Sequence, residues 1–230
     1  MRCALALLAG LSGPAMAQEI VAADLVAPTD RYAHAVLGDA LEWGGLELTL
    51  SDGQRVRFTL PQSHVFEDIT ARLGDFDGDG RAEVMVVETS LTQGAALAIY
   101  AATGRRAATP YIGQPNRWLA PAGWGDFDGD GRIEIAYVDR PHLARELVFV
   151  RLEGSTVTEL ARKAGFTNHR IGDKRISGGT RRCQGRDTVI VASADWSRAV
   201  EVTLGPSGVL AKDIGPWRGV GPDLSTSTCP

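Results

Sequence analysis

Short apolar runs of five to seven residues, separated by turn residues, recur between residues 46 and 213. Runs of this length that are rich in Val, Ile and Thr predict β-strands, whereas an amphipathic helix would need a longer stretch. The expected strands are 46–50, 55–60, 83–88, 95–101, 105–111, 133–138, 146–152, 156–160, 188–192, 199–204 and 208–213. The turn sequence Ser51-Asp52-Gly53 predicts a hairpin between the first two runs. The pattern therefore predicts an all-β protein.

One octapeptide between these runs occurs twice. Gly-Asp-Phe-Asp-Gly-Asp-Gly-Arg occupies residues 74–81 and again 125–132, which is 51 residues later. A fixed period of this size is typical of propellers and solenoids. Each copy follows one strand-like run and precedes three, and four strands in about 50 residues make one propeller blade.

Weaker copies extend the series in both directions. Residues 185–191 parallel 131–137, and the arginines Arg31, Arg81, Arg132 and Arg186 are almost evenly spaced, each opening an apolar run such as 32–37 after Arg31. We therefore expect a small β-propeller, with four blades of four antiparallel strands, in which the N-terminal blade lacks its first strand. The C-terminal stretch 217–228 would supply that strand and close the ring, since closure removes an exposed sheet edge.

The repeated octapeptide also carries a candidate metal site. Three aspartates stand at alternate positions, a glycine follows, and a glutamate comes three residues after that glycine. These residues are Asp75, Asp77, Asp79 and Glu83 in the first copy and Asp126, Asp128, Asp130 and Glu134 in the second. Alternate carboxylates on a tight turn can converge on one hard cation, and calcium prefers oxygen ligands. The sequence predicts two Ca²⁺ sites.

The acidic loops have two other interpretations. An EF-hand needs a bidentate glutamate at position twelve of its loop, but that position holds Val86 in the first copy and Tyr137 in the second. A pair of metal-free Asx-turns is the second alternative, because Asp and Gly are common turn residues. Three carboxylates within five residues repel one another without a counter-ion, which favours a bound metal.

The alternating aspartates, the glycine and the final acidic residue, set between strands at this period, resemble the FG-GAP/VCBS repeat family. The family has the β-propeller fold of the integrin α N-terminal domain, and its acidic loops bind calcium. The resemblance implies that the four carboxylates of each copy are calcium ligands. It also implies that Arg81 and Arg132 contribute backbone carbonyls, and that Phe76 and Phe127 are packing residues.

The third unit departs from this pattern. The positions of its four expected ligands hold Thr180, Arg182, Gln184 and Thr188, so no carboxylate remains and no metal is expected. Arg182 is predicted to supply a fixed cation in place of calcium and to hold the turn by hydrogen bonds to nearby carbonyls.

The N-terminus has the pattern of a secretory signal peptide over residues 1–17. Arg2 is followed by the apolar run 4–11 and by the small-residue cleavage site Ala15-Met16-Ala17. A membrane anchor is the alternative, but the run is short of the roughly 20 apolar residues of a span. We expect an exported protein, periplasmic or secreted, with one domain over 18–230 and no integral membrane segment.

The net charge and the cysteines of the chain after residue 17 further limit the class of protein. Without Arg2 the chain has 23 basic and 28 acidic side chains, a net charge of −5, which argues against nucleic-acid binding. Cys183 and Cys229 are the two cysteines left, and in an exported chain they are expected to form a disulfide. Two free buried thiols are the alternative.

A binding or adhesion-type module, with a protein or glycan partner, is the function we expect from these features. A glycan-binding lectin is the alternative suggested by Trp43, Trp118, Trp124, Trp196 and Trp217, although such residues also serve as packing groups between blades. The basic residues of 162–186 either form an anion site or a solvated face, and a solvated face is the more common case.

An enzyme is the class with the least support. The four histidines, His34, His64, His142 and His169, are scattered over different units, and no nucleophile elbow, zinc-protease motif or phosphate loop is present. A hydrolase would need a cluster of histidines and carboxylates at the mouth of the propeller channel.

Overall fold

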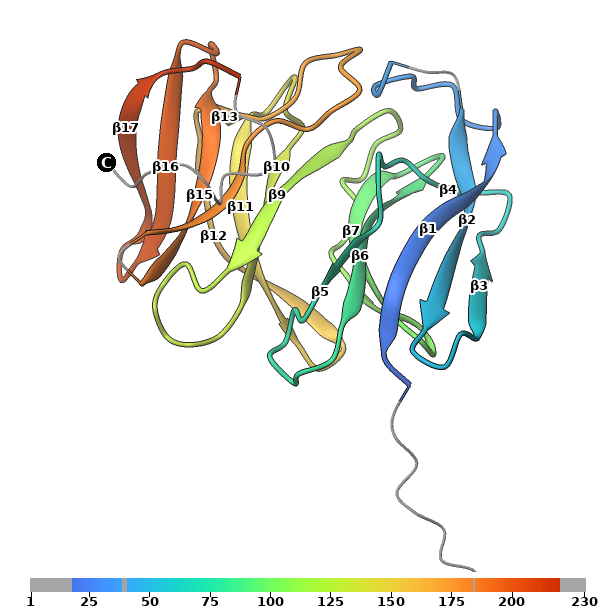
Figure 1. Ribbon diagram of the computed structural model, residues 1–230. Helices are drawn as coiled ribbons and strands as arrows, with labels where there is room; N and C mark the ends of the chain where they lie inside the picture. The colour runs from blue at the N-terminus through green and yellow to red at the C-terminus, as the bar shows by residue number, and fades with distance from the viewer. Residues whose placement is uncertain (1–17, 39–40, 184, 220–230) are drawn as a thin grey trace, which may run out of the picture.

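The computed structural model describes residues 18–38, 41–183 and 185–219, and these residues form β-strands and loops with no helix (Figure 1). The all-β prediction is confirmed. Since the described residues form no helix, none of them provides a helical segment able to cross a membrane. The predicted signal peptide, residues 1–17, lies outside the described residues.

The N-terminal half forms one eight-stranded sheet. Its strands are β1 (Ile20–Thr29), β2 (Glu42–Leu50), β3 (Arg55–Thr59), β4 (His64–Phe66), β5 (Arg72–Gly74), β6 (Glu83–Ser90), β7 (Gly94–Ala101) and β8 (Gly104–Ala108). The main path runs β1-β2-β4-β6-β7-β8, with β3 paired to β2 and β5 paired to β6.

Two further antiparallel sheets follow. The second has the order β12-β11-β10-β9 and contains β9 (Leu119–Gly125), β10 (Glu134–Asp139), β11 (Glu146–Glu153) and β12 (Thr156–Ala164). The third has the order β13-β15-β16-β17, with β14 paired to β15. Its strands are β13 (Phe166–Thr167), β14 (Gly179–Cys183), β15 (Arg186–Ser193), β16 (Arg198–Gly205) and β17 (Gly208–Pro216).

The predicted repeat unit is present three times. In each unit a strand enters the turn and pairs antiparallel with the strand that leaves it, in the registers Gly74↔Glu83, Gly125↔Glu134 and Cys183↔Arg186. We call β5, β9 and β14 the entering strands. The strand that leaves the turn is followed by two more strands of the same sheet, so the hydrophobic pattern located these strands correctly.

The sheets do not form the predicted ring of four separate blades. The N-terminal unit and the unit that carries the first acidic loop share one sheet, because β4 pairs with β2 at Trp43↔Phe66 and also with β6. Within the described residues the sheets stand in an open row, with β1 and β17 at opposite sides (Figure 1). The predicted closing segment is 217–228, of which residues 220–228 lie outside the described residues.

The N-terminal unit differs from its prediction. Residues 32–37, the apolar run after Arg31, form no strand. In place of that run, β1 joins this unit and pairs antiparallel with β2 along most of its length. Its sequence does not alternate cleanly and most of its residues are only partly buried, so the pattern did not reveal it.

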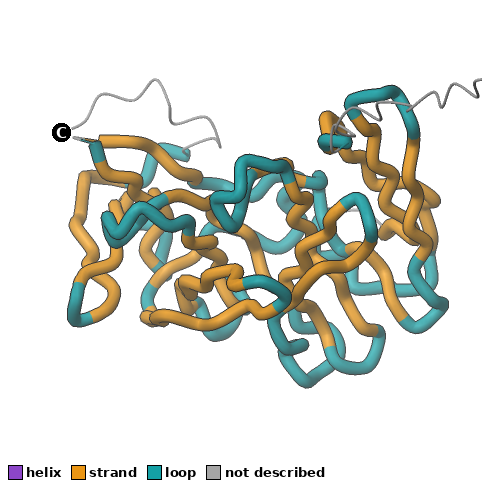
Figure 2. The backbone as a smooth tube through the Cα atoms, turned by 90° about the horizontal axis from the view of Figure 1, so that it is seen from below, coloured by secondary structure: helices purple, strands orange, loops and turns teal. Residues whose placement is uncertain are grey.

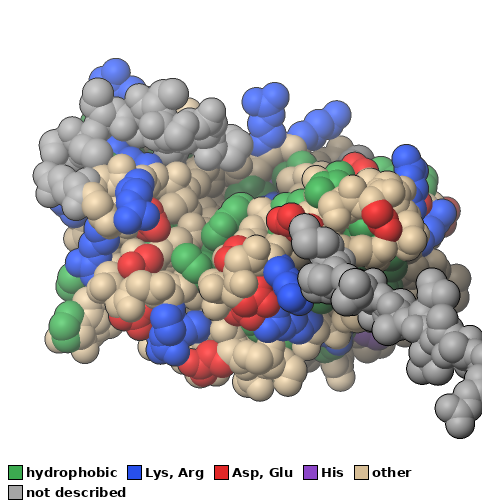
Figure 3. Space-filling view, turned by 60° about the horizontal axis from the view of Figure 1, so that its bottom comes forward, with side chains coloured by type: hydrophobic (Ala, Val, Ile, Leu, Met, Phe, Trp, Pro, Cys, Tyr) green, Lys and Arg blue, Asp and Glu red, His purple; other side chains and the backbone are tan. Residues whose placement is uncertain are grey.

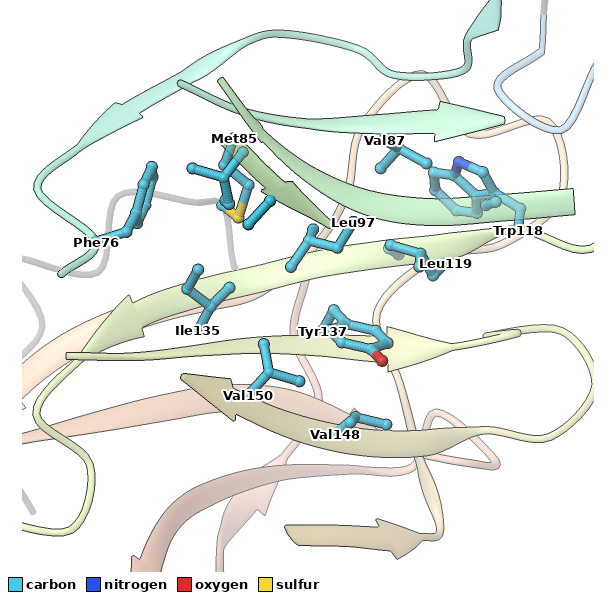
Figure 4. Close-up of a cluster of buried hydrophobic side chains, with 14 of the residues drawn as sticks. Phe76, Met85, Val87, Leu97, Trp118, Leu119, Ile135, Tyr137, Val148 and Val150 are labelled. Atoms are coloured by element: carbon cyan, nitrogen blue, oxygen red, sulfur yellow. The ribbon is translucent and has the colours of Figure 1, made fainter. Parts of the chain in front are cut away.

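The core is divided into three clusters: the N-terminal one lies within the eight-stranded sheet, between β1–β4 and β6–β7, and the other two lie between consecutive sheets. Along β6 the side chains alternate: Val84 and Val86 face the N-terminal cluster, while Met85 and Val87 face the central one. The central cluster packs β6 and β7 against β10 and β11 (Figure 4). The C-terminal cluster packs the other face of the β10–β11 pair against β15 and β16. Figure 2 shows the same row of strands from below.

Gly94, the first residue of β7, is expected to be more sensitive to alanine than the turn glycine Gly53. A Cβ there would lie 2.4 Å from the carbonyl oxygen of Gln114, whereas a Cβ on Gly53 would meet nothing within 4 Å. Both glycines have positive φ, 76° and 83°. The substitution Gly53→Ala therefore carries only the backbone strain of about 1 kcal/mol. Gly94→Ala is expected to cost about 1–3 kcal/mol more, as overpacking does.

Urea unfolding of the two variants at one calcium concentration measures this difference. Equal losses of unfolding free energy would contradict the prediction, because they would mean that the segment around Gln114 moves away without cost.

Candidate metal centres

Two acidic loops lie at the same end of the molecule (Figure 1). The first joins β5 to β6, and the second joins β9 to β10. Each is followed by a strand whose first residue is a glutamate, Glu83 or Glu134. Figure 3 shows acidic and basic side chains next to one another on this end. The two loops are therefore equivalent in position as well as in sequence.

The first aspartate of each loop folds the loop around its own carboxylate. Oδ1 of Asp75 accepts a hydrogen bond from the backbone N–H of Gly78 at 2.7 Å, and Oδ2 accepts one from Gly80 at 2.9 Å. Both glycines have positive φ, 78° and 84°, which a residue with a side chain rarely adopts. Asp126 makes the same two bonds in the second loop, at 2.6 and 3.1 Å. The repeated glycines thus allow the turn that gathers the carboxylates.

Three carboxylates meet in each loop. The groups are Asp75, Asp77 and Glu83, and Asp126, Asp128 and Glu134, and in each group the candidate ligand oxygens lie within 4.8 Å of one another. The glutamate of each group is almost fully buried, at 3% and 0% exposure. Its Oε2 accepts a hydrogen bond from the backbone N–H of the loop phenylalanine, Phe76 or Phe127. Both phenylalanines are fully buried, as expected for packing residues.

The third aspartate of each loop is placed differently. Neither Asp79 nor Asp130 belongs to the close groups. Each accepts a hydrogen bond through Oδ1 from the backbone N–H two residues later, that of Arg81 or Arg132, at 2.8 Å. The roles predicted for these four residues as ligands remain predictions.

Two arginines that sequence reasoning missed reach into the acidic groups. Nη2 of Arg151, on β11, lies 3.1 Å from Oδ2 of Asp128 and 3.0 Å from Oδ2 of Asp130, and it also pairs with Glu134. Arg106, on β8, pairs with Asp77 and lies 2.9 Å from Glu83. A guanidinium group therefore stands among the carboxylates of both loops. A signal for Arg151 was present, since it is the one charged residue inside the apolar run 146–152 that is not at its end.

The buried position of the two glutamates has an electrostatic consequence. Burial raises the pKa of Glu83 and of Glu134 above the usual range for glutamate, although the paired arginine and the phenylalanine N–H oppose this shift. At the exposed edge of the second loop, the backbone N–H of Arg132 lowers the pKa of Asp130. A positive charge at the centre of each group stabilises the ionised glutamate.

The groups fit a hard cation. The clustered ligand atoms are all carboxylate oxygens, which suit Ca²⁺ or Mg²⁺, whereas zinc sites usually contain Cys or His ligands. Asp128 and Glu134 keep one oxygen bound to the backbone and direct the other to Arg151. An ion would use the oxygens that the arginine now contacts, so arginine and metal are alternative counter-ions.

Neither of the two close acidic groups found among the described residues includes a residue of the third unit. The predicted role of Arg182 is only partly right. It donates a hydrogen bond to the carbonyl of Gly185 at 3.0 Å, but 67% of its side chain is exposed, so it is not a buried substitute for a metal. Arg186, which is partly buried, donates to the backbone carbonyls of Phe127 and Asp128 and so braces the second acidic loop.

The basic residues between 162 and 186 mostly have partners. Arg162 pairs with Asp139, Glu146 and Glu159, and Arg181 pairs with Glu201. The guanidinium of Arg170 lies 4.1 Å from the ring centre of Trp196. The segment is therefore not one continuous anion site.

Three of the four histidines are closer together than their sequence positions suggested. His142 and His169 are joined by a hydrogen bond of 3.0 Å and lie beside Trp118, whose indole N–H donates to the carbonyl of Glu67. The carboxylate of Glu67 is buried and bonded to Nδ1 of His34. Burial lowers the pKa of His142 to about 4, so this histidine is neutral at pH 7.

The predicted disulfide lies partly beyond the description. Cys183 ends β14, and Cys229 lies outside the described residues, so the pairing remains a prediction.

A comparison with known protein families found a match for part of the chain. Residues 49–137 match the family model of the FG-GAP-like repeat. The matched segment contains both acidic loops with their glutamates. No curated protein and no solved structure matched the chain. The predicted resemblance to FG-GAP repeats is confirmed over this segment.

Proposed function

We propose that the protein is an exported binding module of the β-propeller type, stabilised by two calcium ions, and the match of residues 49–137 to the FG-GAP-like repeat supports this. The observation that carries the proposal is the equivalence of the two acidic loops. Two separate loops gather three carboxylates within 4.8 Å of one another. Three carboxylates this close together repel one another, which favours a bound cation that offsets their charge.

Calcium has a structural role in this proposal. Asp75, Asp77 and Glu83 would hold one ion, and the resemblance adds Asp79 and the carbonyl of Arg81. The equivalent residues of the second loop would hold the other ion. The ion supplies positive charge and oxygen-ligand bonds, which tie the turn to the first residue of the following strand. Binding to the folded state alone stabilises that state by mass action.

The match to the FG-GAP-like repeat supports a binding role, because this repeat suggests a binding module of the β-propeller type. We propose that the sheets form a scaffold for contact with a protein or glycan partner outside the cell. In the proposed propeller, the stretch 217–228 would close the ring by completing the N-terminal unit.

Calorimetric titration of calcium into chelator-treated protein tests the proposal. We expect two ions per chain, with dissociation constants in the range of about 10⁻⁴–10⁻³ M that is common for extracellular modules. Asp77→Asn and Asp128→Asn should each remove one site, because asparagine keeps the hydrogen bond to the loop backbone but loses the charge. Asp24→Asn, on the exposed surface of β1, is the control and should bind two ions.

Magnesium should bind more weakly at both sites, since it prefers to keep several waters. The absence of heat from calcium, or unchanged stoichiometry in Asp77→Asn and Asp128→Asn, would contradict calcium binding by these loops.

A further inference from the structure

A cavity of about 590 Å³ lies between the three entering strands, apart from the acidic loops. Its walls come from residues 69–72 before and in β5, from 121–124 in β9, and from 175–180 before and in β14. The lining includes exposed residues such as Ile69 and Arg175, so the cavity opens to the surface. A volume of this size is in the range of small-molecule sites, roughly 300–1,000 Å³.

Small residues keep this space free. The strands approach through Ala122, Gly123 and the pair Gly178-Gly179, which have little or no side chain to fill it. Gly123 has φ of 146°, and a Cβ there would lie 1.9 Å from Oγ1 of Thr180. The close contact of β9 with β14 therefore requires glycine at position 123, and the cavity is a consequence of this packing.

The apolar part of the lining is anchored in the core. Trp124 packs edge-to-face against buried Phe76, with the ring centres 5.3 Å apart. Ile176 packs against the central hydrophobic cluster. Both side chains are only partly buried, and both line the cavity. A ligand in the cavity would thus meet an indole and an aliphatic side chain that are held from behind.

The charged part of the lining is entirely basic. The lining residues include Arg72 and Arg175 but, among the residues that the structure describes, no Asp or Glu. Arg72 is fixed by a 2.8 Å ion pair to Asp68, whose carboxylate also accepts the backbone N–H of Val87 at 2.8 Å. Arg175 is exposed and forms no ion pair with any described residue. One positive charge at the cavity therefore lacks a partner in the described part of the chain.

We propose that this cavity binds a small organic monoanion with a flat apolar body, such as an aromatic carboxylate or sulfonate. The apolar body would lie against Trp124 and Ile176, where burial of apolar surface stabilises it. The anionic group would lie toward Arg175, with Arg72 as a second donor. This inference goes beyond the proposed calcium-stabilised module, because it uses none of the acidic-loop residues.

Fluorescence titration with anilinonaphthalene sulfonate, an aromatic monoanion, tests the proposal. All titrations contain excess calcium, so that the state of the acidic loops does not vary. We expect saturable binding of one probe per chain and a rise in the unfolding midpoint on binding. Phenylnaphthylamine, which has the same rings without the charge, should bind about tenfold more weakly.

Arg175→Gln should weaken probe binding about fivefold, as expected for loss of one partly exposed charge pair. Lys174→Gln is the matched control, since Lys174 is the exposed neighbour, carries the same charge and does not line the cavity. Its affinity should be unchanged. Absence of saturable binding, equal effects of the two substitutions, or equal affinity for the neutral probe would overturn the proposal. None of these outcomes bears on calcium binding.

Discussion

Chelation of calcium is expected to lower the midpoint of thermal unfolding by roughly 10–20 °C, compared with protein in calcium at about one hundred times the dissociation constant. At that concentration each site stabilises the folded state by about 2.7 kcal/mol, and in a chain of this length 1 kcal/mol shifts the midpoint by about 2–4 °C. Two sites together give the expected range. Scanning calorimetry with chelator and then with calcium measures it.

Single substitutions divide this effect between the loops. Asp77→Asn and Asp128→Asn should each retain about half of the calcium-dependent shift, and Asp24→Asn should retain all of it. A calcium-independent midpoint in the unsubstituted protein would mean that Arg106 and Arg151 are the permanent counter-ions of the acidic groups. The loops would then be metal-free turns, and the proposed structural role of calcium would be wrong.

Replacement of Arg151 by methionine is expected to lower the free energy of unfolding by about 3–5 kcal/mol in chelator, which is the usual cost of leaving a buried charge unpaired. The side chain of Arg151 is 6% exposed and that of its partner Glu134 is fully buried. Calcium supplies the missing positive charge, so the loss should be much smaller when calcium is present. Urea unfolding with and without calcium measures both values.

Arg132→Met is the matched control for this experiment. Arg132 also pairs with Asp130, but 58% of its side chain is exposed, and exposed ion pairs contribute about 0–1 kcal/mol. Its loss should be small in both conditions. An equal loss for Arg151→Met with and without calcium would show that the arginine and the ion do not substitute for each other in the second loop.

The strands could be predicted from the sequence because their signals are local. Apolar runs such as 83–88 and 133–138 are bounded by turns, and they became β6 and β10. The arrangement of the sheets could not be predicted in the same way. The link through β4 depends on the pairing of Trp43 with Phe66, which lie on either side of the hairpin of β2 and β3, so no local turn signal predicts that they pair. The period of the repeats predicts units, and tertiary contacts decide whether the units separate into blades.

Only some residues of the candidate site could be predicted from the sequence, for the same reason. The acidic residues of each loop lie within nine positions, so their convergence follows from the turn that the glycines allow. Arg106 and Arg151 reach the loops from β8 and β11, and their approach depends on how the sheet twists. The histidine cluster around Trp118 was missed for the same reason, because His34, His142 and His169 come from three separate segments.

The division of the core into three layers gives the protein a gradient of local stability. The sheet faces of β6–β7 and β10–β11 are covered on both sides, whereas the strands β1–β4 contribute to the N-terminal cluster only. In a row of stacked units, each unit depends on its nearest neighbours, and opening begins where a neighbour is missing. Each acidic loop is followed directly by one of the strands covered on both sides, β6 or β10. The ions would therefore be held by the part of the chain that opens last, and they would be retained while the outer units open and close.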